Sequence, residues 1–335
     1  MATISQPSSA AGDFAKPRRS RLAAVWQFCV QNPLGAAGGL VVAVMILMAV
    51  LADVVTVYDP TRNNFGAMLE APSSEYWLGT DQYGRDLYTR IVYGARTALL
   101  VGFVSAFVGA TLGLILGVAS AYFGGRFDLV FQRVMDVLMA FPLVILALAV
   151  VSIFGTGTLN VIIAITIPFI PRCARVVRSS ALAVRETPYI DAARACGFSH
   201  TRIVLRHMVP NVMAPYLIMM TAAVGQAILI EASLSFLGLG VQEPVPAWGL
   251  MLRGGAQEYA ESAPWVAIYP GIAISLAVFG FNLFGDALRG HRRAHHAARP
   301  ALLERRASGS LRQRRDFLRA APHGEGPGPP IALSA

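Results

Sequence analysis

Long apolar stretches, separated by shorter polar ones, divide most of the sequence. A bilayer's hydrocarbon core is about 30 Å thick, so a helix of about 20 apolar residues crosses it. In lipid, a helix also pairs its own backbone polar groups. Six stretches meet this length, at 34–57, 98–123, 138–154, 159–177, 212–237 and 264–288. The pattern predicts an all-α polytopic membrane protein with six transmembrane helices.

The fourth stretch is the weakest of the six because Pro168 and Pro171 lie inside it. Transmembrane helices tolerate proline where neighbouring groups restore the lost backbone partner, so we still expect a span there. Composition agrees with this class of protein. Hydrophobic residues make up 55% of the chain and charged residues 14%, and the mean hydropathy is +0.54.

Arginines predict the orientation, since cytoplasmic loops of membrane proteins hold an excess of positive charge. Basic residues precede the first stretch and lie between the second and third and between the fourth and fifth, namely Lys16, Arg18, Arg19, Arg21, Arg126, Arg133, Arg185, Arg194, Arg202 and Arg206. We therefore expect these loops and both termini in the cytoplasm.

The same pattern divides the chain into successive parts. We expect a cytoplasmic segment at 1–33, a first transmembrane helix at 34–57 and an external segment at 58–97. A five-helix core follows at 98–289 and contains a cytoplasmic loop at 183–211. The remaining residues, 290–335, are rich in Arg, Ala, His, Pro and Gly without apolar periodicity, which predicts a disordered basic tail.

Charge and cysteine content exclude several kinds of partner. The net charge of +9 comes from basic residues beside the membrane ends and in the tail, so we expect contact with anionic lipid and no nucleic acid. The three cysteines, Cys29, Cys173 and Cys196, all fall on the cytoplasmic side and have no metal-ligating neighbour in sequence. We expect no disulfide, no metal and no cofactor in this chain.

Two features inside the apolar stretches stand out. Gly109, Gly113 and Gly117 recur at every fourth residue of the second stretch, a spacing that gives one helix face a smooth surface for close packing. Glu231 lies within the fifth stretch. A carboxylate there must face protein or water, so it could line a solute path or act as a structural acceptor.

The polar stretch "RETPYIDAARACGFSH" interrupts the apolar pattern after the fourth span. Thr187 and Pro188 predict the start of a helix, and Gly197 predicts its end. This helix is too polar to span and has no core of its own. We expect a partner surface, which the small side chains of Ala192 and Ala193 would approach closely; the alternative is a helix lying on the membrane surface.

This loop resembles the EAA loop of permease subunits in binding-protein-dependent ABC importers. Asp191, Ala192, Ala193, Gly197 and Pro210 match its pattern, although Asp replaces the usual Glu and His207 replaces an Ile. Four other stretches are similar to the dipeptide, oligopeptide and nickel branch: "LGTDQYGRDLYTRIVYGARTALLVG", "GGRFDLVFQRVMDVLMAFP", "EASLSFLGLGVQEPVPAWGLML" and "NLFGDALR". The single long external segment indicates the C-type member of that branch.

The resemblance implies a type I ABC importer permease fold, a place in a bacterial inner membrane and the corresponding partners. These are a homologous second permease subunit, two cytosolic ATPases that hold ATP and Mg, and an external solute-binding protein. The loop would dock on an ATPase as a coupling helix between Glu186 and Gly197. The implied coupling residues are Glu186, Tyr189, Asp191, Ala192, Ala193, Gly197, Arg202, His207 and Pro210.

Catalytic motifs are missing from the sequence. A GxxxxGK[ST] phosphate loop needs a lysine, and the only lysine is Lys16 in "DFAKPRR". Neither HExxH nor GxSxG occurs. We therefore expect a transport subunit that is not an enzyme, with a membrane-embedded enzyme and a passive channel as the alternative classes.

The cargo and the tail remain open at this stage. Short peptides are favoured over nickel, because no histidine lies in a span or an external loop; opine and glutathione are further alternatives. After "GDALR" the chain lacks the acidic residue and "LDPR" that usually follow in this branch. The residues beyond 289 are either a native extension or a frameshifted reading of the gene.

Overall fold

The computed structural model describes residues 29–287. The chain divides into two compact units, residues 1–287 and 288–335. The described residues belong to the first unit. The expectations for the N-terminal residues up to 28 and for the tail at 290–335 lie outside the described residues. Within the described part, secondary structure is helical, and extended pairing is limited to one isolated bridge between Thr80 and Asp86. The predicted all-α class is confirmed.

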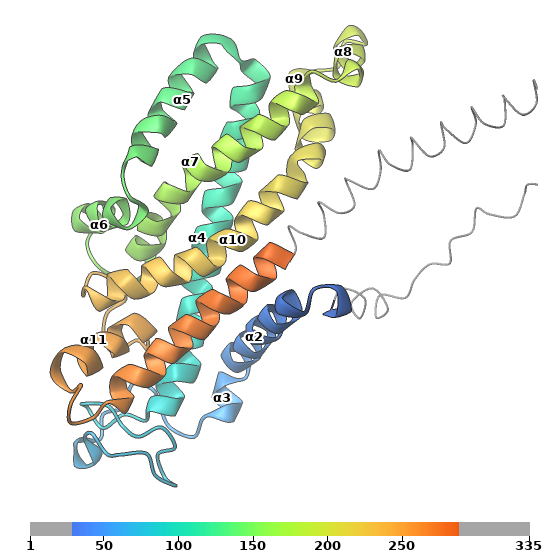
Figure 1. Ribbon diagram of the computed structural model, residues 1–335. Helices are drawn as coiled ribbons and strands as arrows, with labels where there is room; N and C mark the ends of the chain where they lie inside the picture. Colours follow the sequence, from blue (N-terminus) through green and yellow to red (C-terminus); the bar gives the residue numbers. More distant parts are fainter. Residues whose placement is uncertain (1–28, 288–335) are drawn as a thin grey trace, which may run out of the picture. The chain divides into compact units, whose positions relative to one another are not determined.

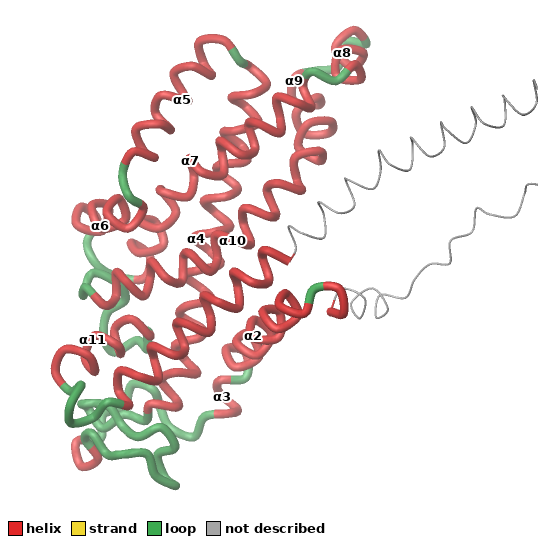
Figure 2. Tube along the Cα trace, in the orientation of Figure 1, coloured by secondary structure: helices red, strands yellow, loops and turns green. Residues whose placement is uncertain are grey.

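The helices form an elongated bundle with loops gathered at one end and a short helix projecting at the other (Figure 1, Figure 2). We call these the α11 end and the α8 end. The helices are α2 (Pro33–Val50), α3 (Ala52–Val55), α4 (Leu87–Phe123), α5 (Gly125–Ala140), α6 (Leu143–Phe154), α7 (Thr158–Arg185), α8 (Pro188–Ala195), α9 (His200–Ile203), α10 (Val209–Phe236), α11 (Trp248–Glu258) and the last helix, Trp265–Ala287. A 3₁₀ turn at Phe65–Ala67 and a π-turn at Val204–Met208 are also present.

Between residues 29 and 287, five helices are long and apolar enough to cross a membrane, and a bent pair could supply the sixth span. The bent pair is α5 and α6, which meet at 94°. The expected third span at 138–154 is thus wrong in detail, since α6 alone has only 12 residues. Pro142 disfavours the helical conformation of the residue before it, and Phe141 is accordingly extended, with φ −87° and ψ 136°.

Two other spans differ from their predicted bounds because polar side chains set their ends. The first ends at Val50 and not at residue 57; Arg96 donates a hydrogen bond to the Val50 carbonyl (3.3 Å) and pairs with Asp53 (2.8 Å). The second begins at Leu87 and not at residue 98. There, Asp86 caps α4 by accepting bonds from the Thr89 backbone N–H (2.9 Å) and hydroxyl (2.6 Å).

Helix α4 forms the centre of the bundle, with α7 and α10 packed against it. Gly109, Gly113 and Gly117 of α4 lie against α7 of the same chain. A Cβ atom on Gly113 would come within 2.7 Å of the Cys173 Cβ, and one on Gly117 within 2.5 Å of the Ala174 carbonyl oxygen. Any side chain there would force the two helices apart. Pro168 and Pro171 are both inside α7, which remains one helix of 28 residues.

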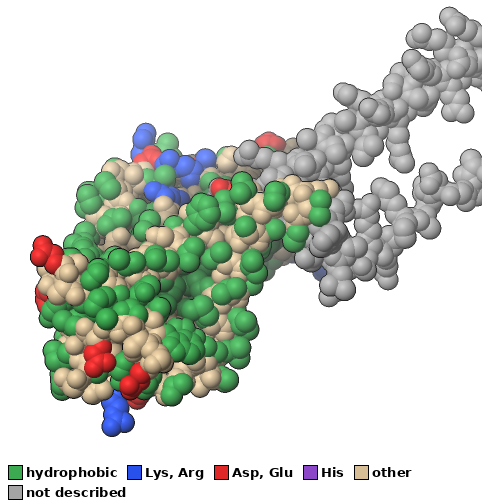
Figure 3. All heavy atoms as spheres, turned by 60° about the horizontal axis from the view of Figure 1, so that its bottom comes forward, with side chains coloured by type: hydrophobic (Ala, Val, Ile, Leu, Met, Phe, Trp, Pro, Cys, Tyr) green, Lys and Arg blue, Asp and Glu red, His purple; other side chains and the backbone are tan. Residues whose placement is uncertain are grey.

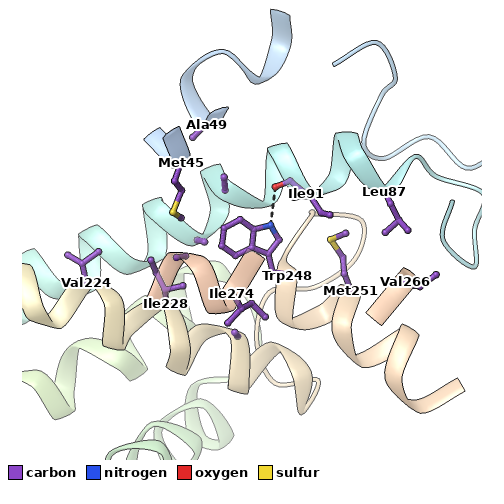
Figure 4. Close-up of a cluster of buried hydrophobic side chains, with 14 of the residues drawn as sticks. Met45, Ala49, Leu87, Ile91, Val224, Ile228, Trp248, Met251, Val266 and Ile274 are labelled. Carbon is purple, nitrogen blue, oxygen red and sulfur yellow. Dashed lines mark hydrogen bonds between the residues drawn. The ribbon is translucent and has the colours of Figure 1, made fainter. Parts of the chain in front are cut away.

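Trp248 anchors the α11 end of the core (Figure 4). Its indole N–H donates to the Ile91 carbonyl of α4 at 2.9 Å, and its ring lies over Gly94, where a Cβ would clash at 2.5 Å. Met45, Ile228, Met251 and Ile274 pack around it. The contacts fix α11 and the loops near it to α4.

Candidate functional site

The predicted partner-docking loop forms a short helix at the tip of the α8 end (Figure 1). Thr187 is extended, with φ −83° and ψ 139°, and Pro188 supplies the first residue of α8 with φ already fixed for a helix. The Thr187 hydroxyl donates to the Val184 carbonyl at the end of α7. The chain thereby turns sharply from α7 into α8.

Gly197 ends α8 through a left-handed turn. The Gly197 N–H donates to the Arg194 carbonyl (2.9 Å) and the Phe198 N–H to the Ala193 carbonyl (3.1 Å). These two bonds define a Schellman motif, which requires positive φ at the residue after the cap; Gly197 has φ +74°. A Cβ there would meet nothing within 4 Å, so the backbone conformation, and not lack of space, requires glycine.

The two faces of α8 have different surroundings. Ile190 and Ala193 are buried in the chain's own core, where they pack with residues of α4, α9 and α10. Tyr189, Asp191 and Ala192 are exposed. This corrects the expectation that both alanines face a partner: they are adjacent in sequence and so point about 100° apart on a helix. Of the two, only Ala192 has an exposed methyl group.

Hydrogen bonds join α8 to the start of α10. The Asn211 side-chain amide donates to the Tyr189 hydroxyl (3.0 Å) and to the His207 carbonyl (2.6 Å). His207 lies in the π-turn, a wide helical turn often found at functional positions. Its ring stacks on Phe198 with centroids 6.0 Å apart, and the Arg202 guanidinium covers the Phe198 ring at 4.1 Å.

A second set of bonds joins the loop to the end of α4. The Tyr122 hydroxyl is 2.6 Å from His200 Nδ1, and Arg185 donates to the Ala121 carbonyl at 2.8 Å. Sequence reasoning missed Tyr122, His200 and Asn211 as parts of this site. In the sequence, each of these residues is only a polar or aromatic residue near a predicted helix end. Such a position does not indicate which group the side chain will bond to.

The remaining predicted site residues lie apart from these contacts. Glu186 is exposed beside Arg185, 3.6 Å away, and Pro210 lies in the first turn of α10. Glu231 is far along α10, is 1% exposed and accepts a bond from the Ser235 hydroxyl at 2.7 Å. Ser235 in turn accepts from the Val241 N–H at 3.2 Å. This chain of bonds favours the structural reading of Glu231.

An ion network of three buried side chains and the exposed Glu243, which sequence reasoning did not single out, lies at the α11 end. Arg85 pairs with Asp81 (2.7 Å) and Glu243 (2.6 Å), and Arg90 lies 3.5 Å from each of the same two carboxylates. Burial lowers the pKa of the Arg85 guanidinium, but its bonds with Glu243 and Asp81 outweigh this, so the net shift of that pKa is upward. The network ties the segment before α4 to the loop before α11.

Among residues 29–287, no group of three or more His, Cys, Asp or Glu side chains is arranged to hold a metal ion. At the α8 end, α8 presents an exposed helix surface with arginine side chains near it. Its bonds connect that face to two of the long helices.

Comparison with known families and proteins assigns the chain to a protein family. Residues 109–292 match the family "Binding-protein-dependent transport system inner membrane component". Residues 20–72 match the "N-terminal TM domain of oligopeptide transport permease C", which confirms the C-type assignment.

Individual relatives agree with these matches. The chain is 42% identical to a dipeptide transport system permease of Alkalihalophilus pseudofirmus over 77% of this chain and 85% of that protein. It is 40% identical to a glutathione transport system permease of Pectobacterium atrosepticum over 79% and 88%. A chain in an inward-facing structure of the MetNI methionine ABC transporter covers 61% of this chain and 97% of its own length, with a TM-score of 0.49 and 20% identity. The protein belongs to the binding-protein-dependent inner membrane permeases, as an ABC importer permease of the dipeptide and oligopeptide branch.

Proposed function

We propose that this chain forms half of the translocation pathway of an importer for di- or oligopeptides, and that α8 docks on a cytosolic ATPase. Membership of the family implies, in general, a partner permease, ATPase subunits and a solute-binding protein. ATP hydrolysis takes place on separate chains. Two relatives carry the names of dipeptide and glutathione permeases; glutathione is itself a short peptide and is the second candidate cargo.

The distribution of charge supports the orientation that docking requires. Exposed arginines gather at the α8 end, namely Arg126, Arg194, Arg202 and Arg206. Acidic residues at the α11 end are exposed, among them Glu70, Glu75, Glu258 and Glu261, and acidic side chains appear on that face when it is turned forward (Figure 3). Because positive charge favours the cytoplasmic side, the α8 end lies in the cytoplasm in this proposal.

The exposed face of α8 is the observation that carries the docking role. Tyr189, Asp191 and Ala192 face outward, while the opposite face is fixed to the bundle through Ile190 and Ala193. A helix held in this way can transmit a displacement without unfolding. Closure of the ATPases moves α8, and the bonds at Asn211 and Tyr122 pass that movement to α10 and α4, which switches the pathway between its two open states.

An arginine at position 192 tests the docking role. We expect Ala192→Arg to lower ATP-driven peptide uptake at least ten-fold in proteoliposomes that contain all subunits, because the larger side chain fills the docking face. The bundle should keep its unfolding temperature, since Ala192 is exposed. The matched control is Ala260→Arg, which adds the same side chain at an exposed position of the α11 end and should leave uptake unchanged. Normal uptake by Ala192→Arg contradicts the docking role.

The cargo is tested separately with the wild-type importer. Competition of a labelled dipeptide by unlabelled dipeptides, glutathione and nickel ions should show the dipeptides as the strongest competitors. Stronger competition by glutathione would favour glutathione as the cargo. Stronger competition by nickel ions would reject both peptide candidates.

A further inference from the structure

Arg172 is a charged residue inside a transmembrane helix. A span of about 20 residues that starts at Thr158 covers the bilayer core and reaches to about residue 178, so Arg172 lies within it. Its side chain is exposed on the surface of this chain, whereas its neighbours Pro171 and Cys173 are buried. The guanidinium therefore points out of the bundle at membrane depth.

Lipid is a poor environment for this side chain. An arginine costs about 2.5 to 3.5 kcal/mol at the centre of a transmembrane helix on insertion scales, and less at the position of Arg172, which lies nearer the α8 end of the span. Charged residues within spans accordingly face a protein interior or a water-filled cavity. Within residues 29–287, no carboxylate forms an ion pair with Arg172, and its one hydrogen bond goes from Nη1 to the Gln226 side-chain oxygen at 3.2 Å.

Two amide side chains from other helices extend this polar site. Gln226 is an exposed residue of α10. Asn282, an exposed residue of the last helix, places its side-chain oxygen 3.3 Å from where a Cβ on Gly225 would be. Arg172 contacts Gln226, and Asn282 lies beside the adjacent Gly225, so polar side chains of α7 and the last helix (Figure 1) meet neighbouring positions of α10.

We propose that Arg172, Gln226 and Asn282 line the translocation pathway, and that Arg172 binds the C-terminal carboxylate of a passing peptide. A guanidinium presents two parallel N–H groups to a carboxylate. Four of its five N–H groups are not used by the Gln226 bond. The amides of Gln226 and Asn282 both donate and accept, which suits the peptide backbone. The inference rests on the proposed function, because it assigns a substrate contact to that pathway.

Water access distinguishes a pathway from a lipid-facing or subunit-buried position. In the assembled importer, Arg172→Cys in a background with Cys29→Ser, Cys173→Ala and Cys196→Ser should react with a charged, water-soluble thiol reagent. A dipeptide with a free carboxylate, supplied on its binding protein, should slow the reaction, whereas Phe107→Cys, at an exposed apolar position midway along α4, should not react. An inert thiol at position 172 would overturn the proposal and indicate contact with lipid or with the partner permease.

Transport of two matched cargoes tests the carboxylate contact itself. We expect Arg172→Gln to lower uptake of a dipeptide about ten-fold at saturating binding protein while changing uptake of the same dipeptide with an amidated C-terminus much less, and Arg172→Lys to restore part of the loss. Arg175→Gln removes a charge one turn away and should have a smaller effect on uptake. If the wild-type importer transports no peptide, the proposed function is wrong. If the wild-type importer transports peptide and the Arg172→Gln variant transports it equally well, only the present inference is wrong. Loss of subunit assembly in Arg172→Gln would also overturn it, in favour of an interface ion pair.

Discussion

The two ends of the bundle are held together by different kinds of contact. At the α11 end, Arg85 and Arg90 are 4% and 1% exposed and share the carboxylates of Asp81 and Glu243. At the α8 end, the bonds of Asn211 and Tyr189 are between neutral groups and are exposed to solvent. Buried charged side chains hold the α11 end. Exposed hydrogen bonds, for which water can substitute, join α8 to α10 at the other end.

This difference agrees with the proposed function, in which the α8 end moves with the ATPases and the α11 end does not. Removing one partner of a buried ion pair costs about 3 to 5 kcal/mol, because the other charge stays buried without compensation. A neutral hydrogen bond contributes only about 0.5 to 1.5 kcal/mol. The exposed hydrogen bonds at the α8 end can therefore rearrange while α8 moves with the long helices, under a load that leaves the α11 end unchanged.

The largest expected effect comes from breaking the ion network. Arg85→Ala removes the shortest partner of Asp81 and Glu243 and leaves only Arg90, 3.5 Å from each, so we expect a loss of about 3 kcal/mol in stability, the lower end of the range for a broken buried pair. It should appear as a markedly lower unfolding temperature in detergent and a lower yield. Arg253→Ala, at an exposed arginine of the same end, is the control and should change neither. Equal stability of the two variants would mean that the network does not fix this end.

A smaller effect is expected at the end of α8. Gly197→Ala must place a Cβ at φ +74°, which costs about 1 to 2 kcal/mol, so the Schellman turn should open and peptide uptake should fall several-fold. Gly197→Asn should keep more uptake, because Asn tolerates the left-handed region better than Ala. Circular dichroism and unfolding temperature check that the bundle remains intact. Equal uptake by both variants would show that the turn geometry is unimportant.

The smallest effect is expected from the bonds between α8 and α10. Asn211→Ala and Tyr189→Phe should each lower the number of peptides moved per ATP hydrolysed by about two- to ten-fold, as expected for a loss of about 0.5 to 1.5 kcal/mol. Because the two side chains share a bond, the double variant should be less impaired than the sum of the single ones. Additive losses would indicate that the residues act independently.

Sequence alone was sufficient for the all-α class and for five of the six expected spans, because hydropathy reports directly what lipid requires. It was insufficient at the bend after Ala140, since the apolar pattern runs through Pro142 without interruption. The start of α4 was also misplaced, because the cap at Asp86 and the two arginines that follow it, Arg90 and Arg96, make a helical segment look like a polar loop.

At the candidate site, the limits of the sequence have a similar cause. The glycine that ends α8 could be predicted, because positive φ depends on local chemistry. The direction of Ala193 could not, since it depends on which face of α8 meets the bundle. Likewise, Arg172 gave no signal within the fourth apolar stretch, because its exposure follows only from the packing of α7 against α4 and α10.

Labelling of Cys196 tests the central claim, docking of α8 in the cytoplasm, most directly. This cysteine is exposed at the end of α8 and can be kept as the only one after Cys29→Ser and Cys173→Ala. A membrane-impermeant maleimide should label it in inside-out vesicles but not in right-side-out vesicles, and addition of the ATPase subunits should protect it. Labelling in right-side-out vesicles, or labelling that the ATPase subunits do not change, would contradict the account.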